Sequence, residues 1–66
     1  MFKICINGKE KNLNWSHDIY DYIKKVLQID KNLDLLHDIQ WFCANADVGD
    51  TYGGNYSGFI IERISW

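Results

Sequence analysis

The stretch from Asn32 to Ala46, NLDLLHDIQWFCANA, has the pattern of an amphipathic helix. Its apolar residues recur at the i, i+3, i+4, i+7 spacing that puts them on one helical face for three turns. They are Leu35, Leu36, Ile39, Phe42, Cys43 and Ala46. Asn32 suits the N-cap position, because its side-chain oxygen can accept a hydrogen bond from an amide of the first turn. The sequence therefore predicts a helix over residues 32–46 with one buried face.

The opposite face of this predicted helix is acidic. Asp34 and Asp38 are four residues apart, so both carboxylates project from the same side, and Trp41 follows one turn later. Like charges at this spacing destabilise a helix by about 0.2–0.5 kcal/mol, so they do not help it to form. We expect this face to bind a basic partner, with Asp34, Asp38, Trp41 and His37 as candidate contacts.

Length and composition indicate one small domain over residues 1–66. Apolar residues make up 47% of the chain and aromatic residues 15%, which is enough for a packed core. No apolar run is long enough to span a membrane, and residues 1–6 lack the apolar region of a signal peptide. Two cysteines without a metal-ligand spacing suit a reducing compartment. These features predict a cytoplasmic protein without a metal, a cofactor or a membrane partner.

The charges are distributed unevenly around a net charge of −2. Residues 1–17 contain three lysines and one glutamate, whereas residues 18–50 contain seven aspartates and three lysines. Direct binding of nucleic acid requires a basic stripe that displaces counterions, and this chain has none. A basic protein is therefore the expected kind of partner.

The first half of the chain predicts a strand, a turn and a helix. Residues 2–6 alternate in polarity as a strand does, and Asn7-Gly8 is a turn signal. Residues 9–14 are either a hairpin strand or a connection, and their polar composition favours the connection. Ser16 is the expected N-cap of a helix that ends near Gln28 or Ile29.

The last third of the chain begins with a glycine-rich segment, residues 47–58, which we expect to be an exposed loop. Its tyrosines, Tyr52 and Tyr56, are candidate aromatic contacts for a partner. Residues 59–66 follow as a final strand. Because two helices separate the first and last strands, we expect them to pair in parallel with a right-handed crossover.

The expected fold is thus α/β, with two helices packed on a parallel sheet of two strands, or three if residues 9–13 join it. An α+β fold with an N-terminal β-hairpin, similar to a β-grasp, is the alternative. So small a sheet exposes its edges, which makes a homodimer an open alternative as well.

Residues 2–43 resemble the barstar family of ribonuclease inhibitors. The resemblance rests on Ile4–Gly8 (ICING), on a helix with His17 and Lys24-Lys25, and on Asn32-Leu33-Asp34 followed by Leu36 and Asp38. Relative to that family the chain would be shortened at its C-terminal side. The resemblance implies a small parallel sheet with packed helices. It also implies that Asp34 and Asp38 enter the active site of a ribonuclease, with Asp38 in the place of a substrate phosphate.

Two functions are therefore expected, and neither is catalytic, because no nucleophile lies at a suitable spacing from a histidine and an acid. The first is an antitoxin-like inhibitor whose acidic helix occludes the active site of a basic nuclease, in particular a ribonuclease. The second is a self-associating phage or mobile-element protein that inhibits another host protein, or binds a small ligand, through its Gly/Tyr-rich loop. Salt should weaken the first kind of binding steeply, but not necessarily the second.

Overall fold

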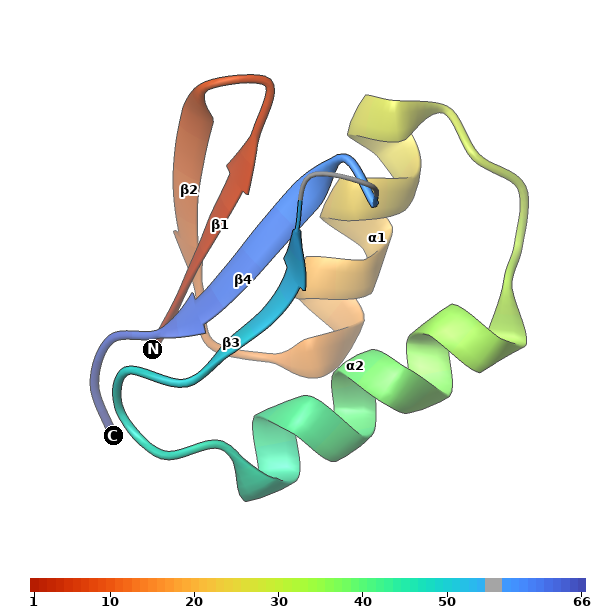
Figure 1. Cartoon of the computed structure of the whole chain (residues 1–66). Coiled ribbons are helices and arrows are strands. Elements are labelled where there is room, and N and C mark those ends of the chain that lie inside the picture. Colours follow the sequence, from red (N-terminus) through yellow and green to blue (C-terminus); the bar gives the residue numbers. More distant parts are fainter. Residues whose placement is uncertain (55–56) are drawn as a thin grey trace.

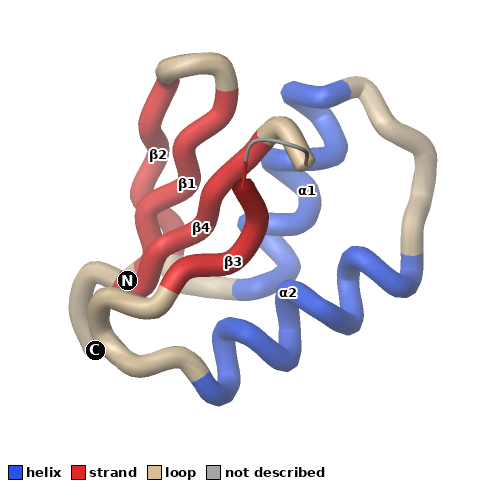
Figure 2. Tube along the Cα trace, in the orientation of Figure 1, coloured by secondary structure: helices blue, strands red, loops and turns tan. Residues whose placement is uncertain are grey.

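The computed structural model describes residues 1–54 and 57–66, which form one four-stranded sheet and two helices (Figure 1). The elements in chain order are β1 (Phe2–Ile6), β2 (Lys9–Leu13), α1 (Ser16–Leu27), α2 (Leu33–Asn45), β3 (Thr51–Gly54) and β4 (Phe59–Arg63). The strand order in the sheet is β2-β1-β4-β3, and both helices lie on the same side of the sheet (Figure 2). The two termini lie side by side, where the Met1 ammonium group donates a hydrogen bond to the Ser65 carbonyl oxygen at 2.8 Å.

The prediction of a parallel sheet is wrong, because every pair of neighbouring strands is antiparallel. β1 and β4 are neighbours, as expected, but Phe2 lies opposite Arg63 and Ile6 lies opposite Phe59. The reason is that residues 51–54, expected to belong to a loop, form a strand. This strand reverses the chain once more, so β4 enters the sheet from the opposite end to the one expected. The fold is α+β.

Residues 9–13 form a strand of the N-terminal hairpin, so their assignment to a connection is also wrong. Ile6 pairs with Lys9 across a two-residue turn in which Asn7 and Gly8 both have positive φ, 53° and 78°. This is the backbone that Asn-Gly favours in tight hairpins. The turn therefore outweighs the weak strand propensity of the polar residues, which an edge strand leaves exposed to solvent.

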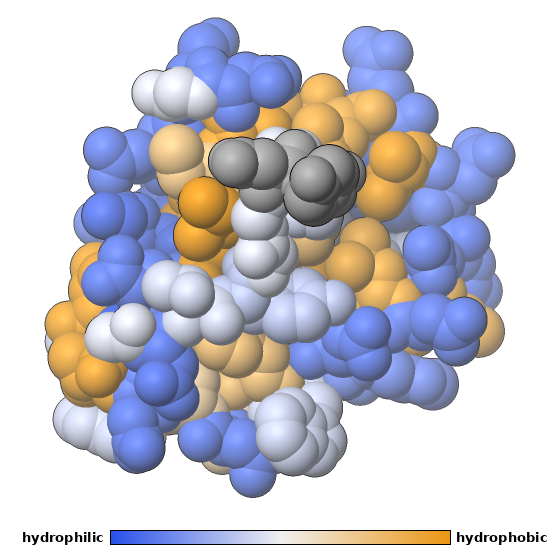
Figure 3. Space-filling view, viewed as in Figure 1, coloured by the Kyte–Doolittle hydropathy of each residue, from blue (hydrophilic) through white to orange (hydrophobic). Residues whose placement is uncertain are grey.

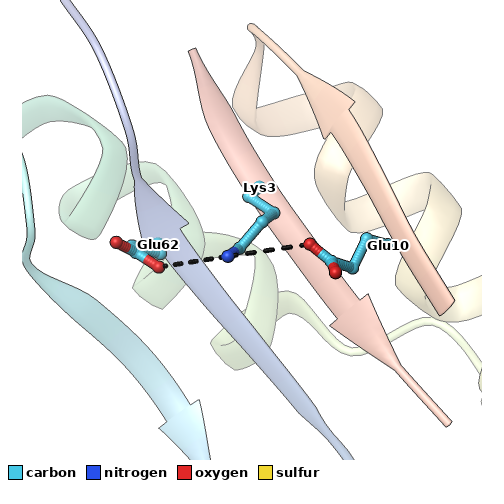
Figure 4. Close-up of polar contacts among 3 residues, drawn as sticks. All are labelled: Lys3, Glu10 and Glu62. Atoms are coloured by element: carbon cyan, nitrogen blue, oxygen red, sulfur yellow. Dashed lines mark ion pairs between the residues drawn. The ribbon is translucent and has the colours of Figure 1, made fainter. Parts of the chain in front are cut away.

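The face of the sheet opposite the helices carries a small ionic cluster (Figure 4). Lys3 on the central strand β1 lies between Glu10 of β2 and Glu62 of β4, with each nitrogen–oxygen distance 3.6 Å. Such exposed pairs contribute at most about 1 kcal/mol each. The cluster fits the register, in which Glu62 lies directly opposite Lys3.

The other face of the sheet forms the core with the helices. The buried residues are Phe2, Ile4, Ile6, Ile19, Tyr20, Ile23, Ile39, Phe42, Ala46, Phe59 and Ile61. In α2 the predicted apolar face is confirmed: Ile39, Phe42 and Ala46 are buried, and Leu35, Leu36 and Cys43 pack partly buried against them.

The helix starts agree with the sequence only for α2. The Asn32 side chain accepts a hydrogen bond from the Leu35 amide at 3.1 Å, so the predicted N-cap is confirmed. In α1 the capping residue is Trp15, whose side chain makes no capping hydrogen bond, and Ser16 is already inside the helix. The assignment of Ser16 as N-cap is therefore wrong.

The C-terminal end of α2 is capped from the sheet. Its last turn contains no basic residue, and the Arg63 guanidinium of β4 donates to the carbonyl oxygens of Cys43 and Ala46, both at 3.2 Å. A cation at this position also opposes the negative end of the helix dipole. Arg63 lies over the rings of Phe2 and Trp66 as well, so one side chain joins α2, β1 and the C-terminal residues.

Neither helix, within the part of the chain that the structure describes, has the length and apolar character needed to cross a bilayer. Cys5 and Cys43 are both free and partly buried. Burial raises the pKa of the Cys43 thiol, and the positive charge of Arg63 opposes this shift.

Candidate functional site

The exposed face of α2 presents four of the predicted contact residues. Asp34, His37, Asp38 and Trp41 are all exposed, and 71% of the Trp41 surface is open to solvent. Among residues 1–54 and 57–66, both ion pairs are made by Lys3 on the far face of the sheet. The carboxylates of Asp34 and Asp38 therefore have no basic partner in this part of the chain.

The strand β3 lies beside this face because a tight turn precedes it. The Asp50 amide donates to the Asp47 carbonyl oxygen, and the Asp50 carboxylate accepts from the Asp47 amide, both at 3.0 Å. This turn starts β3 in register with β4, where Tyr52 lies opposite Ile61. Tyr52 is thereby placed on the same side of the sheet as the buried Ile61 and next to α2.

Tyr52 links β3 to the acidic face. Its hydroxyl group donates a hydrogen bond to Asp38 Oδ2 at 3.1 Å. Partial burial raises the pKa of the Tyr52 phenol, and the hydrogen bond to Asp38 and the negative charge of Asp38 raise it further. At neutral pH the phenol is protonated, so it can hold the Asp38 carboxylate in one orientation.

A row of aromatic rings fixes Tyr52 in turn. The ring centroids of Phe42 and Tyr52 are 5.8 Å apart, and those of Tyr52 and Phe59 are 6.1 Å apart. Phe42 also packs on Phe2, with a centroid distance of 6.1 Å. Tilted pairs at such distances add about 0.5–1.5 kcal/mol beyond the area that they bury. The hydroxyl group that orients Asp38 is therefore anchored to the core.

A groove of about 390 Å³ lies between α2 and β3. We call it the α2–β3 groove; it is lined by Asp38, Trp41, Phe42, Thr51 and Tyr52. Figure 3 shows apolar surface in the space between β3 and the C-terminal half of α2, with strongly hydrophilic surface beside it. A carboxylate next to three aromatic rings is an arrangement that attracts cations.

The structure brings three of the six predicted contact residues together. Asp38, Trp41 and Tyr52 line the groove, whereas Asp34 and His37 lie on α2 outside it. Tyr56 lies outside the described residues. Sequence reasoning missed Phe42, assigned to the core alone, and Thr51, assigned to a loop. Phe42 follows Asp38 by four residues and therefore lies next to it on the helix surface, which was the available signal for Phe42, whereas Thr51 gave none.

A second hollow adjoins the groove on the other side of Tyr52. It has a volume of about 300 Å³ and is lined by Leu35, Tyr52, Gly53, Gly54, Ser57 and Phe59. Gly53 has φ +98°, and a Cβ atom there would collide with the Phe59 carbonyl oxygen, so this position requires glycine. The hollow contains no charged group.

In the described residues, no three His, Cys, Asp or Glu side chains gather in a way that could hold a metal ion. No protein-family model matches the chain, and neither the curated protein sequences nor the solved structures contain a match. The acidic face of α2 and the α2–β3 groove are therefore the features that bear on function.

Proposed function

We propose that this protein is a small inhibitor that binds a basic protein through the exposed face of α2, and that its target is a nuclease, specifically a ribonuclease. The observation that carries the proposal is the acidic face of α2, on which Asp34 and Asp38 are exposed and neither takes part in an ion pair within residues 1–54 and 57–66. The active sites of such enzymes contain basic groups that bind phosphate, and carboxylates can occupy the same positions. The resemblance to barstar implies a parallel sheet, and the sheet is antiparallel, so the fold does not support the resemblance. The choice of a ribonuclease therefore rests on the matching residues alone.

Preorganisation supports an inhibitory role. Asp38 lies on a helix of 13 residues, and the Tyr52 hydroxyl group orients its carboxylate. Side chains that are already ordered lose little conformational entropy on binding, which favours affinity. An unscreened acidic face also accelerates the encounter with a basic partner at low salt.

Affinity capture tests the proposal. The wild-type protein and the double variant Asp34→Ala/Asp38→Ala serve as baits in the same cell lysate, and Asp18→Ala/Asp21→Ala on α1 serves as the charge-matched control. We expect the wild type and the α1 control to recover a basic nuclease whose activity is inhibited, and the α2 double variant to lose it. Recovery should fall steeply between about 50 and 500 mM salt, because the Debye length shortens from roughly 14 to 4 Å.

Recovery of the same partner by all three baits would contradict the proposal. The acidic face would then be only a solvated surface, and the segment around β3 would become the binding site to test. Recovery of an acidic partner, or of one whose activity is unchanged, would equally exclude inhibition of a basic nuclease.

A further inference from the structure

We infer that the outer edge of β3 binds an extended, uncharged segment of a partner protein, which joins the sheet as a fifth strand. The segment places an apolar side chain in the second hollow, beside Gly53 and Gly54. This inference goes beyond the proposed function, because it uses backbone groups and an uncharged hollow and not the acidic face of α2. Its carrying observation is an edge strand whose alternate residues are exposed.

The outer edge of β3 presents backbone hydrogen-bonding groups at every second residue. β3 is the last strand of the sheet and pairs with β4 on one side (Figure 2). The Arg63 amide donates to the Asp50 carbonyl oxygen at 3.1 Å, so at this position the backbone groups face β4. Opposed residues of an antiparallel pair alternate between bonded and non-bonded pairs. The N–H and C=O groups of Thr51 and Gly53 therefore face away from β4.

The exposure of β3 agrees with this alternation. Thr51 and Gly53 are exposed, whereas Tyr52 and Gly54 are half-buried. Because Gly53 has no side chain, its exposed surface belongs to the backbone. Within residues 1–54 and 57–66, no backbone–backbone hydrogen bond outside the ladder with β4 involves Thr51 or Gly53. Donors and acceptors in this order match those of another extended chain, which can add to a sheet edge as a strand.

The strand at the opposite edge, β2, is protected against such pairing by its charges. Three of its five residues, Lys9, Glu10 and Lys11, are charged and exposed. Charged side chains, lysine in particular, protect an edge strand from pairing with another chain. β3 has the sequence Thr-Tyr-Gly-Gly and carries no charge. The comparison of the two edges therefore favours β3 as the edge that accepts a strand.

The second hollow determines which side chain the added segment carries. Gly54 lies opposite the buried Phe59, so this position of the sheet faces the helices. A residue added opposite Gly54 faces the same way and meets the hollow of about 300 Å³, which Leu35 and Phe59 help to line. The hollow contains no charged group, and its volume accommodates a leucine side chain. An apolar residue therefore fits this position of the segment.

A second copy of the chain is a poorer occupant than a segment of another protein. Two β3 strands would pair antiparallel around Tyr52, because Thr51 and Gly53 are the residues with outward groups. The two α2 helices would then lie on the same side of the joined sheet, each with Asp38 held beside Tyr52 by a hydrogen bond of 3.1 Å. Like charges would approach each other, which disfavours this dimer.

Nuclear magnetic resonance tests the inference on the intact chain, with the peptide acetyl-Leu-Thr-Val-Thr amide as the probe. In the expected antiparallel register its leucine lies opposite Gly54, and the amides of its two threonines face Gly53 and Thr51. The matched control peptide carries N-methyl groups on these two amides, which removes the donors and keeps every side chain. A third peptide has serine in place of leucine.

We expect the probe to bind with a dissociation constant on the order of millimolar, because it is short and flexible. At ten times this concentration about a tenth of the protein stays free, so hydrogen exchange at the Thr51 and Gly53 amides should slow about tenfold. The Glu10 and Asn12 amides face outward on the β2 edge by the same alternation, and their exchange should not change. The N-methylated peptide should bind about tenfold more weakly or worse. The serine peptide should bind about fivefold more weakly or worse.

Proline substitutions at the two edges supply matched variants of the protein. Thr51→Pro removes an outward N–H group from β3, and Asn12→Pro removes one from β2. An edge strand tolerates proline where the N–H group faces solvent. Thr51→Pro should raise the dissociation constant of the probe about fivefold or more, and Asn12→Pro should change it by less than about twofold. If Thr51→Pro does not fold, the two peptides that differ only in N-methylation decide the question on the wild type.

Several results would overturn the inference. Equal binding of the plain and N-methylated peptides would exclude pairing through the backbone. Equal slowing of exchange at Glu10 and Asn12 would mean that the peptide does not distinguish the two edges, and equal binding of the serine peptide would exclude the hollow. Slow exchange at Thr51 and Gly53 without peptide, more pronounced at higher protein concentration, would assign the edge to a second copy of the chain.

The outcome is separable from that of the proposed function. The probe is uncharged, so its dissociation constant should change by less than about twofold between about 50 and 500 mM salt, whereas capture through the acidic face should fall steeply. If the probe binds the β3 edge but no nuclease is recovered, this inference stands and the proposed function fails. If a nuclease is recovered but the probe does not bind, the acidic face stands and this inference fails.

Discussion

α1 and α2 have nearly the same length, 12 and 13 residues, but they differ in the charges of their exposed faces. In α1, Asp18 lies in the first turn and Lys24 and Lys25 in the last, which is the order that the helix dipole favours. In α2, Asp34 and Asp38 have no basic counterpart on the helix, and the cation at its C-terminal end is Arg63 of β4. The exposed charges of α1 are thus balanced along the helix. In α2 the helix dipole also favours Asp34 in the first turn, but Asp38 lies beyond that turn and no cation on the helix balances the pair, so this acidic face remains available to a partner.

The largest expected effect comes from truncating core residues, and it should be similar for the two helices. Ile23 of α1 and Ile39 of α2 are both fully buried. Ile23→Ala and Ile39→Ala should each lower the free energy of unfolding by about 2–5 kcal/mol, as lost burial and a new cavity combine. Urea denaturation measures both, and the valine variants, at about 0.5–1.5 kcal/mol, remain measurable if the alanine variants unfold. A loss well below 1 kcal/mol at Ile39 alone would show that α2 is not part of the core.

At the C-terminal ends the two helices should differ. Arg63→Met keeps most of the aliphatic stem but removes the donors to Cys43 and Ala46, so it should lower the free energy of unfolding by about 1–3 kcal/mol. Lys25→Met in the last turn of α1 should cost less than about 0.5 kcal/mol. Thermal unfolding compares the two variants. Equal decreases in the free energy of unfolding would contradict the capping of α2 by Arg63.

At the N-terminal ends the difference should be smaller. Asn32→Ala removes the acceptor for the Leu35 amide and should destabilise the protein by about 1 kcal/mol. Ser16→Ala should change stability by less than about 0.5 kcal/mol, because Ser16 is not the cap of α1. If Ser16→Ala lowered the free energy of unfolding as much as Asn32→Ala does, Ser16 would be a helix cap after all.

The smallest expected effect is the pH dependence of the contact between Tyr52 and Asp38. The pKa of Tyr52 is raised in the folded protein, so the folded state retains this proton at a pH where the unfolded state loses it. The resulting stability is present below the ordinary tyrosine pKa of about 10 and is lost as the pH rises through the folded value. Chemical denaturation between about pH 9 and 11 should therefore show a steeper decline for the wild type than for Tyr52→Phe. Identical slopes would mean that the contact does not form in solution.

Periodicity in the sequence predicted both helices and the buried faces of α2 and β1, because the face of a helix or strand is a local property. The spacing from Leu35 to Ala46 identified the buried side of α2, and the alternation in residues 2–6 identified the buried side of β1. The pairing of strands is a long-range property. Nothing in residues 59–63 indicates whether they run parallel or antiparallel to β1. The polar residues of β2 and the glycines of β3 are not typical of strands, so two of the four strands could not be recognised from composition.

Only the helical part of the candidate site could be predicted, because contacts within one helix are local and contacts between strands and helices are not. Asp34, Asp38 and Trp41 share a face through their spacing on one helix, whereas Tyr52 lies 14 residues beyond Asp38. Only the formation of β3 brings the Tyr52 hydroxyl group to Asp38 and closes the groove. The capping of α2 by Arg63 is likewise a contact between distant segments that no local pattern indicates.

The most direct test of the account compares one aspartate from each helix. The affinity of the captured partner is measured by isothermal titration calorimetry for the wild type, for Asp38→Asn and for Asp18→Asn. Both variants remove one exposed carboxylate and leave the core untouched. We expect Asp38→Asn to weaken binding by about 2–5 kcal/mol and Asp18→Asn to change it by less than about 0.5 kcal/mol. Equal effects of the two variants would contradict the assignment of the binding face to α2.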